Sequence, residues 1–189
     1  MIVSEKSDAQ YKSADLQTIF NSIFMVSENT ELLTGAAEPV YEPAREVGCL
    51  NKIVSSHDYF ASALHEISHW CIAGVKRRAL LDYGYWYQPD GRNDGQQLEF
   101  EEVEIKPQSM EWIFSMSCGY PFRLSIDNIN SPEVKASGKF KENVYRQTRQ
   151  YMKEGLPSRA DIFARALLNF YRPDCKNLQL CEFSLAELR

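Results

Sequence analysis

The stretch SALHEISHWCIAG, residues 62–74, combines a helical apolar pattern with two histidines four residues apart. Residues i and i+4 of an α-helix lie about 40° apart around its axis, so His65 and His69 can direct both imidazoles at one ion. Glu66 directly follows the first histidine and completes the pattern H-E-x-x-H. The chain has 3 histidines, and two of them are in this stretch. We therefore predict a metal site on this helix.

A separate stripe of the same helix is apolar and is predicted to face the core. Its members are Phe60, Ala63, Leu64, Ile67, Trp70 and Cys71. The two histidines lie at the margin of this stripe, beside residues whose small side chains leave room for an ion. These small residues are Ala61, Ser62, Ser68 and Ala73. A serine caps a helix by accepting a backbone hydrogen bond, so the helix is expected to begin after Ser55 or Ser56 and to end at Gly74.

Two imidazoles leave a divalent ion short of protein ligands, and a carboxylate is expected to complete the set. The acidic segment 99–107, EFEEVEIKP, offers Glu99, Glu101, Glu102 and Glu104. Glu104 is favoured because it lies between two apolar residues, where a carboxylate needs a partner. Two histidines and one carboxylate suit iron(II) oxygen chemistry and equally a catalytic zinc, so the ligand set leaves both metals open. His57, near the expected helix start, is a weaker candidate for a ligand or a substrate contact.

Size and composition indicate one globular domain over residues 1–189, with 44% hydrophobic and 25% charged residues. The net charge of -5 gives no general basic surface for nucleic acid. The one basic cluster, Lys76–Arg78, follows the histidine helix and is a candidate docking point for an acidic protein. The first residues carry acids without an apolar core, so we expect no signal peptide. No run of the sequence approaches the ~20 apolar residues that a membrane span needs. The 5 cysteines form no C-x-x-C pair, which predicts free buried thiols in a reducing cytoplasm.

The remaining pattern predicts an α+β fold, rich in helices, with one small sheet. Helices are expected over 8–25, 110–118, 139–154 and 159–171, the last with a capping box formed by Ser158 and Asp161. Strands are expected over 52–54 and in the aromatic stretch 80–87, with short strands or loop over 31–48. The acidic segment before Pro107 is either extended or the opening of a helix.

Four blocks of sequence resemble the elongation factor P hydroxylase family of bacteria. They are YFASALHEISHWCIAG (59–74), DYGYWYQPDGR (82–92), FEEVEIKPQ (100–108) and GYPF (119–122), within a resemblance over about 15–172. The resemblance implies a compact α+β domain in which His65, His69 and Glu104 are the metal ligands. It leaves the N-terminal residues and the tail from Cys175 onward peripheral.

The resemblance also implies a reaction. Members of the family hydroxylate the modified lysine of elongation factor P after a β-lysyl group has been attached to it, which implies Fe(II) as cofactor, O2 as co-substrate and elongation factor P as protein partner. A requirement for 2-oxoglutarate stays open. Tyr85, Trp86 and Tyr87, with Tyr83, are candidates to wall a slot for the long cationic side chain. Asp82, Asp90 and Asp94 are alternative partners for its ammonium group.

Two other interpretations compete with the hydroxylase. In a small zinc-dependent peptidase or nuclease, Glu66 is the general base that takes a proton from the attacking water. In the hydroxylase, Glu66 serves instead to orient a ligand or the substrate. A purely structural metal is disfavoured, because structural zinc sites have four protein ligands and usually cysteines.

Overall fold

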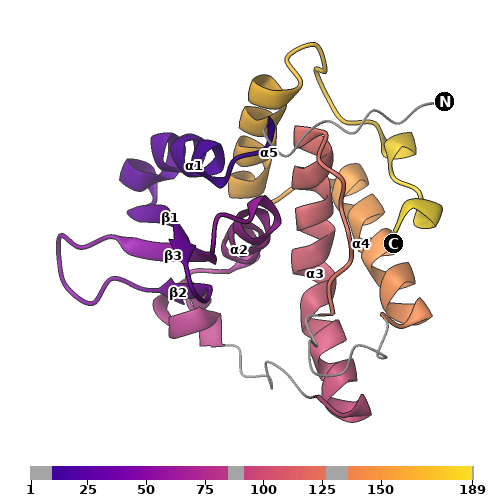
Figure 1. The fold of residues 1–189 in the computed structure, drawn as a ribbon, viewed down its shortest axis with the longest axis horizontal. Helices are drawn as coiled ribbons and strands as arrows, with labels where there is room; N and C mark the ends of the chain where they lie inside the picture. The colour runs from indigo at the N-terminus through magenta and orange to yellow at the C-terminus, as the bar shows by residue number, and fades with distance from the viewer. Residues whose placement is uncertain (1–9, 85–91, 127–135, 189) are drawn as a thin grey trace.

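The computed structural model describes residues 10–84, 92–126 and 136–188, in which one small sheet packs against a group of α-helices (Figure 1). The α-helices are α1 (Ser13–Ser27), α2 (Phe60–Ile72), α3 (Asp94–Cys118), α4 (Gly138–Glu154) and α5 (Ser158–Tyr171). The strands are β1 (Thr30–Ala36), β2 (Val40–Glu42) and β3 (Asn51–Ser56). The predicted helix-rich α+β class with one small sheet is confirmed.

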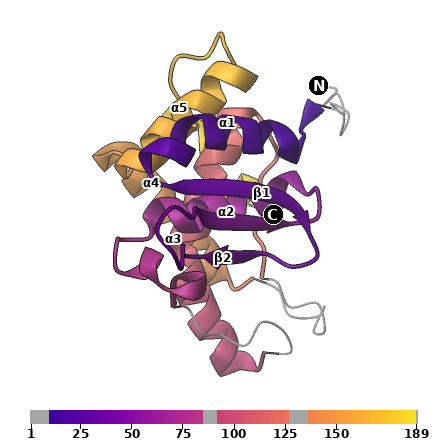
Figure 2. The same ribbon diagram turned by 90° about the vertical axis from the view of Figure 1, so that its left-hand side faces the viewer.

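The sheet has the order β1-β3-β2, with β1 parallel and β2 antiparallel to the central β3. Ile53 on β3 is paired with Leu32 on β1 and with Tyr41 on β2, so these side chains form one row across the sheet. All three are buried in the main core, which they share with α1 and α2. Figure 2 shows α1 lying along the β1 edge and the sheet standing in front of α2.

Helix α2 lies between the sheet and α3, and it contacts β3 as well as α3 (Figure 1). The six residues of its predicted apolar stripe are all buried, so the prediction of its core face is confirmed. This burial holds α2 against the sheet by the hydrophobic effect, which is not directional. The histidine side of the same helix is left facing α3.

Helix α3 is the longest helix, and it contains the acidic segment 99–107, which the sequence predicted to be either extended or helical. Asn93 caps its start, because the Asn93 side chain accepts a hydrogen bond from the Gln96 backbone N–H and the Gln96 side chain accepts one from that of Asn93. The segment before Pro107 is therefore helical. The helix ends at Gly119, whose φ of +71° is left-handed and favours glycine.

Three local predictions are wrong, two of them because a tertiary contact decides the structure. Ser55 and Ser56 belong to β3, and α2 begins only at Phe60, without a side-chain cap. The residues Leu81–Gly84 form a 3-10 helix rather than a strand, since the Tyr83 ring is buried against Tyr41. Ser158 makes no capping hydrogen bond at the start of α5.

The predicted peripheral position of the C-terminal tail is also wrong. Phe183 and Leu188 are buried in a second apolar cluster with residues of α3 and α4. The Phe183 ring meets the Trp112 ring edge-on, with 5.2 Å between their centroids. The tail therefore completes the core on the α3–α4 side.

The predicted burial of the cysteine thiols is correct for only some of them. Cys71 and Cys118 are buried as predicted, but Cys49 and Cys181 are exposed free thiols. Among the described residues, no helix is both long and apolar enough to cross a bilayer.

Candidate metal centre

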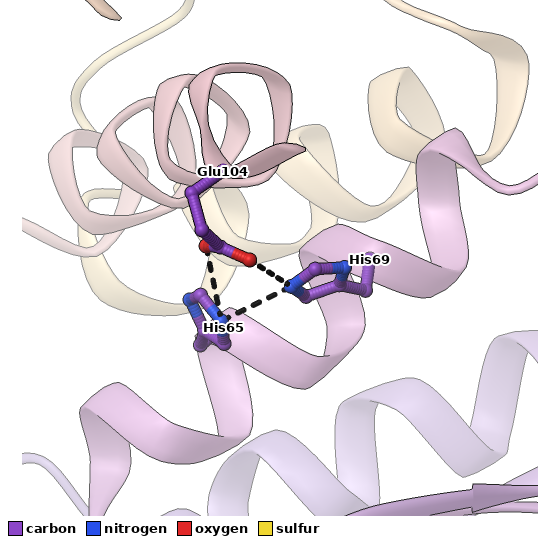
Figure 3. A group of neighbouring side chains, drawn as sticks. All are labelled: His65, His69 and Glu104. Carbon is purple, nitrogen blue, oxygen red and sulfur yellow. Dashed lines mark hydrogen bonds and ion pairs between the residues drawn. The ribbon is translucent and has the colours of Figure 1, made fainter. Parts of the chain in front are cut away.

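His65 and His69 of α2 and Glu104 of α3 point toward one another (Figure 3). The Nε2 atoms of the two histidines are 3.1 Å apart. Glu104 Oε1 lies 3.2 Å from His69 Nε2, and Glu104 Oε2 lies 3.6 Å from His65 Nε2. The structure thus brings together the three residues that the sequence predicts as ligands.

The three ligand atoms fit a shared metal ion. Protein ligands lie about 2.0–2.2 Å from Zn²⁺, so ligands of one ion are separated by about 3–3.6 Å, as observed here. Oε1 of Glu104 is buried with His69 Nε2 at 3.2 Å, and an ion between these two atoms would take the place of this contact. The donor set of two imidazoles and a carboxylate suits Fe(II) as well as Zn²⁺.

The electrostatics of the cluster favour positive charge between the two helices. Burial by itself would raise the pKa of Glu104, but His69 and His65 outweigh it and lower that pKa to about 2. Burial would likewise lower the pKa of His65, but Glu104 and Glu111 outweigh it and raise that pKa to about 10. A bound metal ion would supply positive charge at this place.

Glu111 is a site residue that the sequence analysis missed. It is buried on α3, and its Oε2 atom lies 2.9 Å from His65 Nδ1. Glu111 follows Glu104 by seven residues, which places both on one face of the helix, and this spacing is the signal that could have indicated it. Gln108, between them, donates from Nε2 to Glu104 Oε2 at 3.3 Å and also to the Ser125 carbonyl oxygen at 2.7 Å.

Tyr83 lies against the second histidine. Its ring is nearly parallel to that of His69, at 9° and with 6.1 Å between the centroids. Asp82 and Tyr83 have φ values of 46° and 58°, which are strained for residues other than glycine. Asp82 Oδ1 accepts a hydrogen bond from the Tyr41 backbone N–H, so this candidate ammonium partner already fixes the turn. The ring of Tyr83 thus packs on His69. Tyr83 does not line the cavity beside the cluster.

A cavity of about 490 Å³ opens beside the cluster. His65, Glu104 and Glu111 line it, and so do Ala61 and Ser62, whose small side chains leave space as predicted. Its other lining residues are Pro39, Ser56, Glu66, Phe100, Gln108, Arg123, Leu124 and Ser125. His69 is 6% exposed and lies behind His65, whose side chain is 25% exposed. The cavity therefore reaches the cluster from the His65 side.

Glu66 lines this cavity next to His65. Burial raises the pKa of its carboxyl group, and His65 and His69 only partly oppose this. Within the described ranges its carboxylate takes part in no hydrogen bond or ion pair, so it is available to a molecule in the cavity.

Several other predicted site residues lie away from the cluster. Glu101 is buried but accepts hydrogen bonds from the backbone N–H and the hydroxyl of Ser137 at the start of α4. Glu99 and Glu102 are exposed on α3. His57 is exposed in a turn with a φ of 47°, with its ring on Tyr59. Tyr85, Trp86, Tyr87 and Asp90 lie outside the described residues, as does the side chain of Asp94.

The basic cluster after α2 divides into two parts. Arg78 Nη1 lies 2.9 Å from Glu28 Oε2, and its guanidinium is 5.8 Å from the centre of the Trp70 ring. Arg78 is thus part of the packing and not a free docking charge. Lys76 and Arg77 are exposed, although Arg77 also donates to the Tyr83 carbonyl oxygen.

Most of the chain is similar to known proteins. A sequence profile of the elongation factor P hydroxylase family matches residues 19–183. An elongation factor P lysine hydroxylase of Haemophilus influenzae is 41% identical over 176 residues, which cover 93% of this chain and 98% of that protein. Both matches contain the whole of α2 and α3 and therefore the entire cluster. This chain belongs to the elongation factor P hydroxylase family.

Proposed function

We propose that this chain hydroxylates the β-lysylated lysine of elongation factor P in a reaction that depends on iron and dioxygen. The main support is the cluster of His65, His69 and Glu104 beside a cavity. The chain that contains this cluster is similar over 93% of its length to an elongation factor P lysine hydroxylase. The name of that relative supports the reaction and the protein substrate. The resemblance to the family supports the β-lysyl group as part of the substrate. The donor set of two histidines and one carboxylate, together with this resemblance, supports iron as the metal. Since the substrate is a translation factor, the proposal also implies a cytoplasmic enzyme.

The metal would be held by His65 and His69 of α2 and by Glu104 of α3. Two histidines and one carboxylate are a donor set that suits Fe(II), which would supply the chemistry for the activation of dioxygen. His69 and Glu104 are almost fully buried, which shields their side of the site from water. His65 is the ligand that the cavity reaches, so a methylene group bound there would lie close to the metal.

The charges around the cavity support a cationic guest. Glu66, Glu104 and Glu111 line it, against the single guanidinium of Arg123 among the described lining residues. Glu104 and Glu111 are already paired with histidines, whereas the Glu66 carboxylate is available. A β-lysyl-lysine side chain is long and carries ammonium groups, so we propose Glu66 as an anionic contact for it. The volume of about 490 Å³ is within the range of small-ligand sites.

A zinc hydrolase is the competing function, because Glu66 lies beside the cluster as a general base would. The similarity to a hydroxylase over 93% of the chain favours the hydroxylase. The two functions differ in what Glu66 must do, and substitution of this residue separates them, as described in the Discussion.

The substrate assignment can be tested with two forms of elongation factor P, one carrying the β-lysyl group and one unmodified. Each is incubated with the iron-loaded enzyme and a two-electron reductant, in air and without oxygen, and the lysine-containing peptide is analysed by mass spectrometry. We expect a gain of one oxygen atom only on the β-lysylated form and only in air. Equal products from both forms would remove the β-lysyl group from the proposal, and a product formed equally well without oxygen would contradict hydroxylation.

A further inference from the structure

We infer that Glu111 is a positioning residue for the metal site, which holds the His65 ring so that its Nε2 atom faces His69 and Glu104. The inference rests on the metal site of the proposed function but not on its substrate. His65 uses both ring nitrogens. Nδ1 lies 2.9 Å from Glu111 Oε2, and Nε2 lies 3.1 Å from His69 Nε2.

The contact fixes which nitrogen is available to the metal. A carboxylate is an acceptor only, so the proton of a metal-binding His65 lies on Nδ1, and the Nε2 lone pair is left for the ion. A carboxylate behind a histidine ligand also makes the imidazole a stronger donor. Glu111 thus acts on the metal through His65, without contacting it.

The burial of Glu111 supports a specific role. A buried carboxylate is costly unless it is paired, and among the described residues the partner of Glu111 is His65, from 46 residues earlier in the sequence. Helix α3 therefore supplies both a ligand, Glu104, and the residue that orients a ligand on the facing helix.

The two histidines are held by different means. His69 is buried and has the Tyr83 ring stacked on it, so packing restricts its rotation. His65 is 25% exposed and lines the cavity, where packing restricts it less. The hydrogen bond with Glu111 can hold the His65 ring at this partly exposed position. Loss of Glu111 should thus affect the site mainly through His65.

The test is metal affinity, measured without substrate. Metal-free protein is titrated with Zn²⁺ against a competing chelator, for the natural chain and for Glu111→Ala, Glu111→Gln and Glu101→Ala. We expect Glu111→Ala to raise the Kd about 10–100-fold, the usual cost of losing a group behind a ligand. Glu111→Gln should lose less, because the amide oxygen still accepts from Nδ1–H. Glu101 is the matched control, since it is equally buried on α3 but bonds to Ser137. Its replacement should leave the Kd unchanged.

The outcomes separate the inference from the proposed function. An unchanged Kd in Glu111→Ala, or an equal loss in Glu101→Ala, overturns the positioning role and leaves the metal site intact. A natural chain that binds no Zn²⁺ overturns both. If Glu111→Ala fails to fold, proton NMR of the Zn²⁺-loaded natural chain and of Glu111→Gln decides the matter. We expect a protected His65 Nδ1–H resonance in the natural chain that shifts in Glu111→Gln, and its absence or an unshifted position would contradict the inference.

Discussion

Helices α2 and α3 face each other across the cluster of His65, His69 and Glu104, but they bury different kinds of side chain. The buried face of α2 is apolar apart from Ser68 and His69. Helix α3 buries an unusual number of polar side chains. They are Gln97, Glu101, Glu104, Gln108, Ser109, Glu111, Ser115 and Ser117.

The difference shows how the two halves of the site are held. Helix α2 is placed by apolar contact, which tolerates small rotations. Two polar groups of α3 instead form directional contacts beside the cluster: Gln108 with the backbone of Ser125 and with Glu104, and Glu111 with His65. Such hydrogen bonds fix the rotation of α3 about its axis and with it the direction of Glu104. We conclude that the position of α2 and of His69 depends on the core, whereas the directions of Glu104 and His65 depend on hydrogen bonds.

The largest effect is expected when a ligand is removed from either helix. His65→Ala, His69→Ala and Glu104→Ala should each abolish metal binding and reduce hydroxylation to background, because two ligands do not hold the ion. Elemental analysis of protein purified without oxygen measures the metal content. Glu102→Ala is the control, since Glu102 is exposed on the same helix. Stoichiometric metal in any of the three ligand variants would refute the ligand assignment, and so would loss of metal in the control.

A smaller loss is expected at Glu66, the cavity residue of α2. In the proposed hydroxylase it contacts the substrate or orients a ligand, so Glu66→Gln should keep its metal and lose about 10–100-fold in activity. The remaining activity should require oxygen. In a zinc hydrolase the same variant would lose nearly all catalysis, because the general base is gone. A hydrolytic activity that disappears in Glu66→Gln would favour the hydrolase.

Polar contacts from α5 add to the apolar placement of α2 at its C-terminal end, and they give a stability prediction. Arg159 of α5 donates to the carbonyl oxygens of Trp70, Cys71 and Ala73, and its guanidinium lies 4.6 Å from the centre of the Trp70 ring. Arg159→Ala should lower the free energy of unfolding by about 2 kcal/mol, since these carbonyls lose a charged donor. Urea denaturation measures this. Arg165→Ala, on the exposed side of α5, should leave stability unchanged, and an equal loss there would point to a general effect on the helix.

The smallest effect is expected beyond α2, at the exposed Lys76 and Arg77. If they attract an acidic protein substrate, replacing both by Glu should lower kcat/KM a few-fold at low ionic strength and leave metal content unchanged. The difference should disappear at high salt, because surface charges are screened. A rate that does not change at low salt would show that these residues serve only as solvated surface. Arg78 is left out of the variant because it pairs with Glu28.

The same contrast between the helices explains what could be predicted from the sequence. The histidine pair and the core stripe of α2 are local patterns, and both were predictable within one helix. Glu111 was not, because its meaning depends on His65, 46 residues away. Glu104 was predicted from its apolar neighbours Val103 and Ile105, but these are only half-buried, and Glu104 is buried because its face of α3 meets α2.

Tertiary contacts also explain the wrong predictions. Nothing local in the tail indicates that Phe183 packs on Trp112. The start of α2 was misplaced for a similar reason. Ser55 and Ser56 are suitable residues for a helix cap, but they belong to the central strand of the sheet. The backbone N–H of Ser56 donates a hydrogen bond to Ser62 Oγ of α2. Local capping preference is weaker than sheet pairing here.

The most direct test of the central claim is the origin of the oxygen atom in the product. Iron-loaded protein, a two-electron reductant and β-lysylated elongation factor P are incubated under dioxygen labelled with a heavy oxygen isotope in ordinary water, and in parallel under ordinary dioxygen in water labelled with the same oxygen isotope. Mass spectrometry of the modified lysine then shows which oxygen is incorporated. A hydroxylase with iron bound by His65, His69 and Glu104 should incorporate the label from dioxygen, and the Glu104→Ala variant should incorporate none. Label from water alone, or product formed by Glu104→Ala at the natural rate, would contradict the account.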